Sequence, residues 1–338
     1  MAKIKVTTSF EHPPLERQIP GDSWGKHTFF INKDIAECDF WVVFEGLNET
    51  ETVTCKKGGK ILFTGEPPAI KKYDENFLQQ FDYVVTSHKK INHDRVIRKQ
   101  QSLPWFVGMR YDPKKGEWLD GYSKDFNELK EIESVEKTKL ASVICSDKVG
   151  TSGQRKRLRF LKGLKKNLGD RIDFFGGGFQ AVPDKWDAIA PYKYHICLEN
   201  TATKDYWTEK ISDSYLGLSY PIYWGCTNIN DYFSEDSYAY IDVDNPDKAV
   251  QDVKKILDSN TYRENLANVK KAKDLVLDTY NFFPNVVNLI ENSILQEGFK
   301  KEYKLHPERS RVNLTPARFM KSSIARSIYG RIIDVLEW

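Results

Sequence analysis

The stretch Tyr192–Phe233, YKYHICLENTATKDYWTEKISDSYLGLSYPIYWGCTNINDYF, predicts a strand, a loop, a helix and a second strand in that order. Its first apolar run, Tyr194–Leu198, is short enough for a buried strand. Apolar residues at helical spacing begin after Thr208, and a second apolar run, Tyr220–Trp224, ends at Gly225. This order is typical of a parallel βαβ unit, so we expect an α/β fold.

The loop and the first turn of this predicted helix carry polar residues that suit an anionic ligand. A helix N-terminus presents unpaired N–H groups and the positive end of the helix dipole, which favour a diphosphate. Lys210 adds a positive charge there, and Glu209 can accept hydrogen bonds from sugar hydroxyls. Asn200 and Tyr206 offer further polar contacts. The alternative for Glu209 and Lys210 is a solvated charge pair, because the triplet TEK occurs in many surface helices.

Residues 140–178 contain a second candidate site for phosphate. An apolar run, Leu140–Cys145, precedes a loop with glycine and serine and then a basic helix that includes Arg157. A cationic helix start after a strand can bind phosphate, although a run of charges on a helix is also typical of a solvated face. The next predicted strand, Ile172–Phe175, leads into three glycines, which let the backbone approach a ligand or form a plain turn.

The first part of the chain predicts another sheet. Short apolar runs at Phe40–Phe44, Lys60–Thr64 and Asp82–Thr86 favour an open, mostly parallel sheet, in which ligands bind at the carboxyl ends of the strands. Glu66 follows one such end in a loop stiffened by two prolines. A carboxylate fixed there suits a general base for a sugar hydroxyl. The alternative is an ordinary solvated residue in a proline turn.

The segment between these halves, residues 88–137, is polar and poorly periodic. We expect a loop over Tyr111–Tyr122, which is rich in proline, glycine and lysine. The aromatic side chains of this segment could stack on acceptor sugar rings or form a small satellite core, and a core position is favoured for Trp105 and Phe106. The same two alternatives apply to Tyr111, Trp118 and Tyr122.

Composition excludes several classes of protein. The 338 residues are 40% hydrophobic and 13% aromatic, which indicates one or two domains with real cores rather than a disordered chain. A net charge of +3 does not favour a nucleic-acid partner. The five cysteines form no CxxC pair and the six histidines no HxxxH pair, so we expect neither a disulfide framework nor a metal site. Without a hydrophobic signal region or a membrane-spanning run, we expect a cytoplasmic protein.

The quoted stretch resembles the donor-binding core of the α1,3/4-fucosyltransferases, glycosyltransferase family 10. That family has the pattern YKF-x-L-x-FEN, a short loop, Y-x-TEK, a helix and PIYWG or PVVWG, and this chain has YKYHICLEN, DYWTEK and YPIYWG. The resemblance covers most of residues 38–300 and is strongest at 192–225. It implies a GT-B fold, with two Rossmann-like domains facing across a cleft. An acceptor-binding domain would span residues 1–138, a GDP-sugar-binding domain 139–300, and a basic amphipathic tail 301–338.

The resemblance also implies roles for single residues. FTGE, followed after a gap by FDYVV, is similar to the bacterial members, in which a glutamate at the place of Glu66 is the catalytic base; Asp74 and Glu75 are nearby substitutes. Glu209 would face the ribose and Lys210 the diphosphate. A bacterial relative has a donor-binding arginine soon after its three glycines, which is missing from GGGFQAV in this chain. The donor-binding residues that the resemblance implies are Arg157, Asn200, Tyr206, Glu209 and Lys210.

The function implied is an inverting glycosyltransferase, an α-1,3-fucosyltransferase that moves fucose from GDP-fucose to a glycan acceptor of the lipopolysaccharide, O-antigen or capsule type. It would need no metal and no other cofactor, and the triplet Asp242–Asp244 is expected to be a capping loop. Because the arginine after the glycines is missing, either Arg157 or Lys185 neutralises the phosphate, or the donor is another GDP-hexose. A non-catalytic sugar-binding protein is the alternative of another class.

The C-terminal segment 317–338 has an apolar stripe with basic residues alongside. A basic amphipathic helix can lie on an anionic membrane surface, so peripheral association with the inner membrane is one expectation. Packing on the protein itself or on a second subunit is the other.

Overall fold

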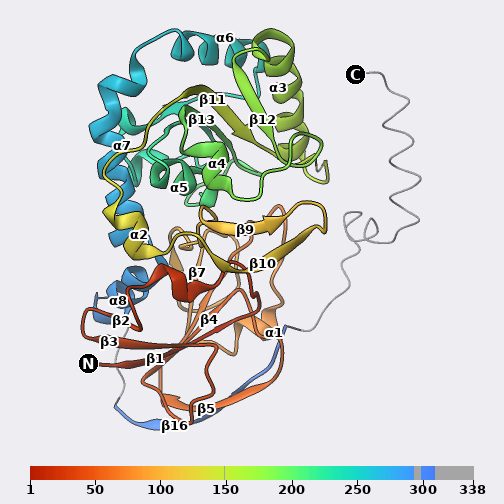
Figure 1. The fold of residues 1–338 in the computed structure, drawn as a ribbon. Coiled ribbons are helices and arrows are strands. Elements are labelled where there is room, and N and C mark those ends of the chain that lie inside the picture. Colours follow the sequence, from red (N-terminus) through yellow and green to blue (C-terminus); the bar gives the residue numbers. More distant parts are fainter. Residues whose placement is uncertain (148, 293–297, 309–338) are drawn as a thin grey trace.

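The computed structural model describes residues 1–147, 149–292 and 298–308, which form two α/β domains, one above the other in Figure 1. The first domain has a seven-stranded sheet in the order β2-β3-β1-β4-β6-β7-β8. The second has a five-stranded sheet in the order β12-β11-β13-β14-β15. The predicted architecture of two α/β domains facing each other is confirmed. The basic tail, including 317–338, lies outside the described residues.

The first sheet is parallel apart from its edge pair β2 and β3. Its central strand β4 is buried along its whole length, which explains the continuous apolar run FWVVF. Val42 and Phe44 enter one core, and Trp41 and Val43 enter the core on the opposite face. The strands are β1 (Lys3–Thr8), β2 (Ser23–Trp24), β3 (His27–Ile31), β4 (Phe40–Phe44), β6 (Lys60–Phe63), β7 (Tyr83–Thr86) and β8 (Val96–Arg98).

The second sheet is parallel throughout. The predicted βαβ unit is confirmed, because β13 (Tyr192–Leu198), α5 (Glu209–Leu216) and β14 (Tyr220–Trp224) follow one another, and β13 pairs with β14. Its other strands are β11 (Lys139–Ile144), β12 (Ile172–Phe175) and β15 (Ala239–Tyr240). Its other helices are α3 (Ser152–Leu168), α4 (Lys185–Ile189), α6 (Pro246–Leu257) and α7 (Thr261–Asp278).

The remaining elements connect or cover the two sheets. A hairpin of β9 (Met109–Asp112) and β10 (Glu117–Tyr122) lies between the domains and is followed by α2 (Phe126–Glu131). Thus Tyr111–Tyr122, which we expected to be a loop, is largely a hairpin. The short helix α1 (Glu75–Leu78) covers the first sheet. The described elements also include three 3-10 helices: η1 (Leu15–Gln18), η2 (Ile229–Asp231) and η3 (Glu235–Ser237).

After the second domain, the chain returns to the first. The helix α8 (Phe282–Asn292) packs on the first sheet, where Phe282 stacks on Phe44 with 5.1 Å between ring centroids. The strand β16 (Lys300–Leu305) then pairs antiparallel with β5 (Glu51–Lys56). The chain therefore crosses back before residue 300, the end that we expected for the second domain. In the part of the chain that the structure describes, no helix combines the length and apolar character needed to cross a membrane.

Candidate active site

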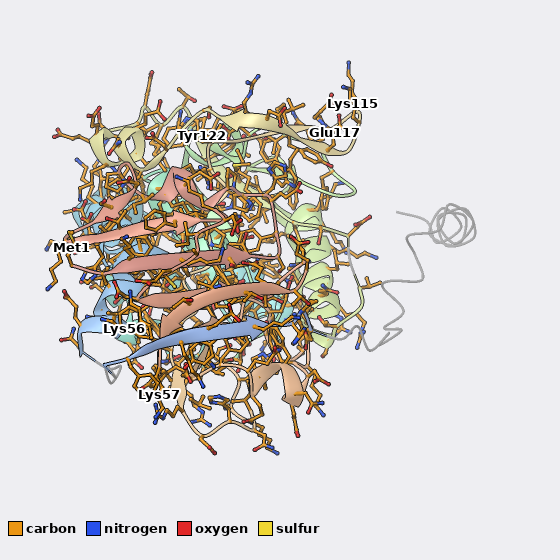
Figure 2. The ribbon with its side chains drawn as sticks, turned by 90° about the horizontal axis from the view of Figure 1, so that it is seen from below. Met1, Lys56, Lys57, Lys115, Glu117 and Tyr122 are labelled. Carbon is orange, nitrogen blue, oxygen red and sulfur yellow. The ribbon has the colours of Figure 1, made fainter. Side chains whose placement is uncertain are left out.

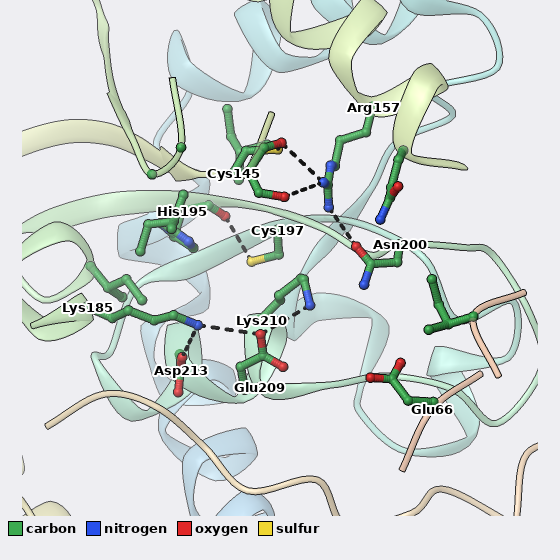
Figure 3. Close-up of a pocket in the computed structure, with 18 residues that line it drawn as sticks. Glu66, Cys145, Arg157, Lys185, His195, Cys197, Asn200, Glu209, Lys210 and Asp213 are labelled. Atoms are coloured by element: carbon green, nitrogen blue, oxygen red, sulfur yellow. Dashed lines mark hydrogen bonds and ion pairs between the residues drawn. The ribbon is translucent and has the colours of Figure 1, made fainter. Parts of the chain in front are cut away.

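A cavity of about 390 Å³ lies between the domains, beside the carboxyl ends of the parallel strands (Figure 3). Glu66 and Ile70 line it from the first domain, and residues of the second domain form the rest of its wall. Tyr206, which we also predicted for the site, is buried outside this lining. The predicted site residues that line the cavity are Glu66, Arg157, Asn200, Glu209 and Lys210.

The first turn of α5 brings Lys210 against two carboxylates, those of the fully buried Glu199 and the partly buried Glu209. Thr208 caps the helix, because its hydroxyl accepts a hydrogen bond from the Lys210 N–H. The Lys210 Nζ lies 3.1 Å from Glu209 Oε1 and 3.4 Å from Glu199 Oε2. Glu199 is fully buried and also accepts the Thr208 N–H at 2.9 Å. TEK is therefore part of a largely buried network rather than a solvated charge pair.

This network fixes the charge of its members. Burial opposes ionisation of Glu209, but the positive charges of Lys210 and Lys185 lower its pKa to about 2. Burial also opposes the charged form of Lys210, yet Glu209 and Glu199 raise its pKa above the ordinary lysine value. Glu209 is consequently a carboxylate and Lys210 an ammonium at neutral pH. For Glu199, burial is the main cause of a raised pKa.

Lys185 connects this network to the segment that crosses between the domains. Its Nζ lies 3.2 Å from Asp213 Oδ2 and 3.5 Å from Glu209 Oε1. Asp213 Oδ1 in turn accepts the N–H groups of Phe106 at 2.8 Å and Val107 at 3.1 Å. The sequence patterns indicate Lys185 but not Asp213. Its position four residues after Glu209, on the same face of α5, was the available signal.

Arg157 reaches the cavity from the second turn of α3. Its guanidinium donates to Asn200 Oδ1 at 2.9 Å and to Ser146 Oγ at 3.1 Å. The side chain is buried, and these partners in the described chain are neutral. Arg157 is therefore a buried cation whose charge no contacting carboxylate compensates, a state that favours an anionic ligand in the cavity.

Glycines allow the close packing around this cavity. A Cβ on Gly153, in the first turn of α3, would stand 2.2 Å from the Asn200 carbonyl oxygen, so only glycine lets the helix start so close to the end of β13. Gly176 has φ +102°, and a Cβ there would stand 2.1 Å from the Cys145 carbonyl oxygen. Gly176 and Gly177 line the cavity, which agrees with the expected approach of this glycine loop to a ligand.

Glu66 stands on the wall that the first domain provides, and its carboxylate is turned to the cavity in Figure 3. Burial and the neighbouring charge of Glu45 raise its pKa above the ordinary glutamate value, while Lys210 acts in the opposite direction. Neither of the two nearby substitutes for this role lines the cavity: Asp74 caps α1 and Glu75 is exposed.

Other polar residues of the second domain have structural partners. His195 lies 2.8 Å from Ser142 Oγ, and burial lowers its pKa to about 3, so the ring is neutral. Asp242 accepts the Asp244 N–H at 3.0 Å, and Asp244 pairs with Lys156 at 2.7 Å, which agrees with a capping loop. Among the residues described, no three or more His, Cys, Asp or Glu side chains form a group able to hold a metal ion.

A row of aromatic rings leads from Lys185, which lines the cavity, to the β9–β10 hairpin. The Lys185 Nζ lies 4.7 Å from the centre of the Phe106 ring, and that ring lies 5.4 Å from Trp118. Tyr111 continues the row, 5.1 Å from Trp118. Figure 2 shows the outer part of the hairpin, with Lys115, Glu117 and Tyr122 labelled at the edge of the molecule.

The burial of these rings separates two kinds of aromatic residue. The rings of Phe106, Tyr111 and Trp118 are all partly exposed. Trp105 is buried in the core of the second domain, as we expected, whereas Phe106 is not.

Comparisons with known proteins find a family match that falls on the second domain. Residues 134–271 match the model of glycosyltransferase family 10 (fucosyltransferase), C-terminal part. The chain is 36% identical over 74 residues to an alpha-(1,3)-fucosyltransferase of Helicobacter pylori, covering 22% of this chain and 16% of the relative. It is 31% identical over 132 residues to a fucosyltransferase-like protein of Arabidopsis thaliana, covering 37% and 24%. These matches span less than a quarter of each relative.

Among solved structures, the chain is similar to an alpha1,3-fucosyltransferase crystallised with GDP-fucose. The sequence identity is 20% and the TM-score 0.45, over 88% of this chain and 93% of that one. An alpha1,3-fucosyltransferase crystallised with GDP is similar at 19% identity and a TM-score of 0.45, over 83% of this chain and 92% of that one.

Proposed function

Because residues 134–271 match the model of glycosyltransferase family 10, we propose that this chain transfers fucose from GDP-fucose to a hydroxyl of a glycan, with inversion at the anomeric carbon. The observation that carries the proposal is the division of charge across the cavity. A carboxylate of the first domain, Glu66, faces a wall of the second domain that carries Arg157 and Lys210. Deprotonation of the acceptor requires a negatively charged base, and release of the diphosphate requires positive charges that stabilise it.

The second domain is the proposed site of the donor. The diphosphate would lie at Arg157 and Lys210, near the N-terminus of α3, because these groups favour negative charge. Lys185 and Lys210 both contact Oε1 of Glu209, so we assign its Oε2 to the ribose hydroxyls. Asn200 Oδ1 accepts a hydrogen bond from Arg157, so the amide N–H groups of Asn200 remain available to the donor substrate.

The proposed reaction is a single displacement. Glu66 accepts the proton of the acceptor hydroxyl while the hydroxyl oxygen bonds to the anomeric carbon of fucose. The bond from that carbon to the diphosphate oxygen breaks at the same time, and GDP leaves with the bonding electrons. Arg157 and Lys210 stabilise the negative charge that grows on the diphosphate. We propose that no metal or other cofactor is required, so transfer should persist in EDTA.

The proposed acceptor is an oligosaccharide or glycolipid, such as a lipopolysaccharide, an O-antigen or a capsule. The partly exposed rings of Phe106, Trp118 and Tyr111 support this class, because sugar rings present apolar C–H faces that pack on aromatic side chains. Membrane contact through 317–338 would bring the enzyme to a glycolipid, and it belongs to the same proposal.

Thermal unfolding with GDP, GDP-fucose, GDP-mannose and UDP-galactose tests the donor. A ligand that binds only the native state raises the midpoint of unfolding by mass action. We expect a rise with GDP and a larger rise with GDP-fucose. A rise with GDP to which only GDP-mannose adds would favour another GDP-hexose, and binding without transfer to any glycan would favour a sugar-binding protein. No shift with any nucleotide would contradict the proposed donor site.

A further inference from the structure

We propose that Glu45, acting through Tyr73, is a positioning residue that holds Glu66 in place for proton transfer. The proposal rests on the function proposed above, because it assumes that Glu66 is the base. Glu45 does not line the cavity and is therefore not itself a catalytic residue.

Glu45 has an unusual backbone conformation for its residue type. It follows the last residue of β4 with φ +68°, in the left-handed region that residues other than glycine seldom adopt. Its own N–H still bonds the Phe63 carbonyl oxygen at 2.8 Å, so the strand pairing continues to this point. The carboxylate lies against the loop that follows the neighbouring strand β6, which is the loop of Glu66.

The hydroxyl of Tyr73 joins Glu45 to that loop, and it uses its one donor and both of its acceptor positions to do so. It donates to Glu45 Oε2 at 2.6 Å and accepts the N–H groups of Gly65 at 3.1 Å and Glu66 at 3.2 Å. The Gly65 N–H also reaches Glu45 Oε2 at 2.5 Å. A Cβ on Gly65 would stand 2.7 Å from that oxygen, so glycine leaves the room that the carboxylate occupies.

The carbonyl of Glu66 is held as well. His88 Nε2 lies 2.9 Å from it and must be the donor, because a carbonyl oxygen only accepts. Burial lowers the pKa of His88, which keeps the ring neutral near pH 7. Side chains thus fix both the N–H and the C=O of Glu66, and they come from different parts of the first domain. Such fixation holds a base within the narrow geometry that proton transfer requires.

Lys71 balances the charge of Glu45. Its Nζ lies 2.7 Å from Glu45 Oε1 and 3.1 Å from Glu308 Oε2. Glu45 raises the pKa of Glu66, and Lys71 lowers it. The other charged groups that act on Glu66 are Glu209, which raises its pKa, and Lys210, which lowers it. His88, Tyr73 and Tyr206 are the neutral titratable groups beside Glu66.

A titration of Glu66 by NMR tests the proposal without requiring activity. The full chain is labelled with ¹³C at the glutamate carboxyls, and the Glu66 signal is assigned by its absence in Glu66→Gln. We expect Glu45→Gln to lower the pKa of Glu66 and Lys71→Met to raise it. Glu291→Gln, which changes an ion pair at the opposite end of the first sheet, should leave it unchanged. Shifts of the same sign in both variants would overturn the proposal, since simple loosening would relieve burial in each.

Transfer kinetics give the second readout. Tyr73→Phe keeps the ring and removes the hydroxyl, and we expect it to reduce kcat by about tenfold or more while the Kd for GDP stays the same. An unchanged kcat in a wild type that transfers fucose would overturn the positioning role. If the wild type transfers no sugar, the proposed function fails; opposite pKa shifts would then still establish that Glu45 and Lys71 act on Glu66.

Discussion

The guanidinium of Arg157 donates to Asn200 Oδ1 at 2.9 Å, which joins the start of α3 to the residue that follows β13. These residues are far apart in the sequence, and both were predicted to bind the donor. Their contact means that the cation is already oriented before a ligand enters. Such preorganisation lowers the cost of binding and of stabilising charge during the reaction.

Arg157→Met should weaken GDP binding by roughly tenfold to a hundredfold, because it removes a buried cation that no carboxylate contacts among the residues described. Isothermal titration calorimetry with GDP measures this. Lys156→Met is the matched control, since Lys156 is the preceding residue of α3 and pairs with Asp244 instead. Equal losses in both variants would indicate a general effect of helix charge and would contradict a specific role for Arg157.

Glu66→Gln should reduce transfer by about a hundredfold to ten-thousandfold and leave GDP binding intact, because the amide fills the same space but cannot accept the proton. Rates of transfer and the Kd for GDP separate the two effects. Glu75→Gln serves as the control, since Glu75 is an exposed carboxylate of the same domain. Transfer at the wild-type rate in the Glu66 variant would remove Glu66 from the mechanism.

Glu66→Gln should also raise the midpoint of thermal unfolding at neutral pH. The pKa of Glu66 is raised in the folded protein, mainly by burial, so its contribution to stability is present at low pH and is lost as pH rises through the folded pKa. At neutral pH the buried Glu66 carboxylate destabilises the folded protein, and Glu66→Gln removes this effect. The gain in unfolding midpoint over the wild type should therefore shrink as the pH is lowered. Calorimetric scans at several pH values measure the difference in midpoint between Glu66→Gln and the wild type. A variant less stable than the wild type at neutral pH would contradict the destabilising effect of the buried Glu66 carboxylate.

The rate of transfer should fall on the acid side at a pH above the ordinary glutamate value of 4.5. The reason is that Glu66 must be ionised to accept a proton, and its burial beside Glu45 raises its pKa. Below that pKa, kcat/KM should fall about tenfold for each pH unit. A profile of kcat/KM for the acceptor against pH measures where this fall occurs. A fall centred at or below pH 4.5 would not fit Glu66 as the base.

Trp118→Ala should raise KM for the acceptor several-fold without changing the Kd for GDP, because Trp118 lies in the aromatic row outside the donor wall. Tyr122→Ala is the control from the same hairpin, at a residue that is 40% exposed and stands at its end. If both variants raise KM equally, the hairpin as a whole supports the acceptor site, and Trp118 has no specific role.

The strands and the first helical turn of the second domain are predictable because their signals in the sequence are local. Tyr194–Leu198 and Tyr220–Trp224 are continuous apolar runs, and Thr208 is a favourable N-cap, so the strands and the start of α5 fall where the patterns indicate. The β9–β10 hairpin was missed because its strands are short and polar and are separated by a segment that begins with Pro113.

The support around the site was harder to predict because it depends on contacts between distant segments. Tyr73 is an ordinary aromatic residue in the sequence, and nothing near it indicates that its hydroxyl meets the Glu66 N–H. Asp213 likewise accepts the N–H groups of Phe106 and Val107, more than a hundred residues earlier. Only the folded chain brings these groups together, so residue types and spacing identified the polar wall but not the groups that orient it.

The return of α8 to the first sheet has a consequence for the synthesis of this protein. Phe282 and Phe283 are fully buried in the first core, where they pack on rings that include Phe44 and Phe29. A nascent chain that has just left the ribosome up to residue 278 contains every strand of both sheets, yet it lacks these two rings. Domains generally fold in the order of their synthesis, N-terminal first. In this chain the second domain can complete its core first, and the domain that is translated earlier must wait for α8, the last helix among the residues that the structure describes.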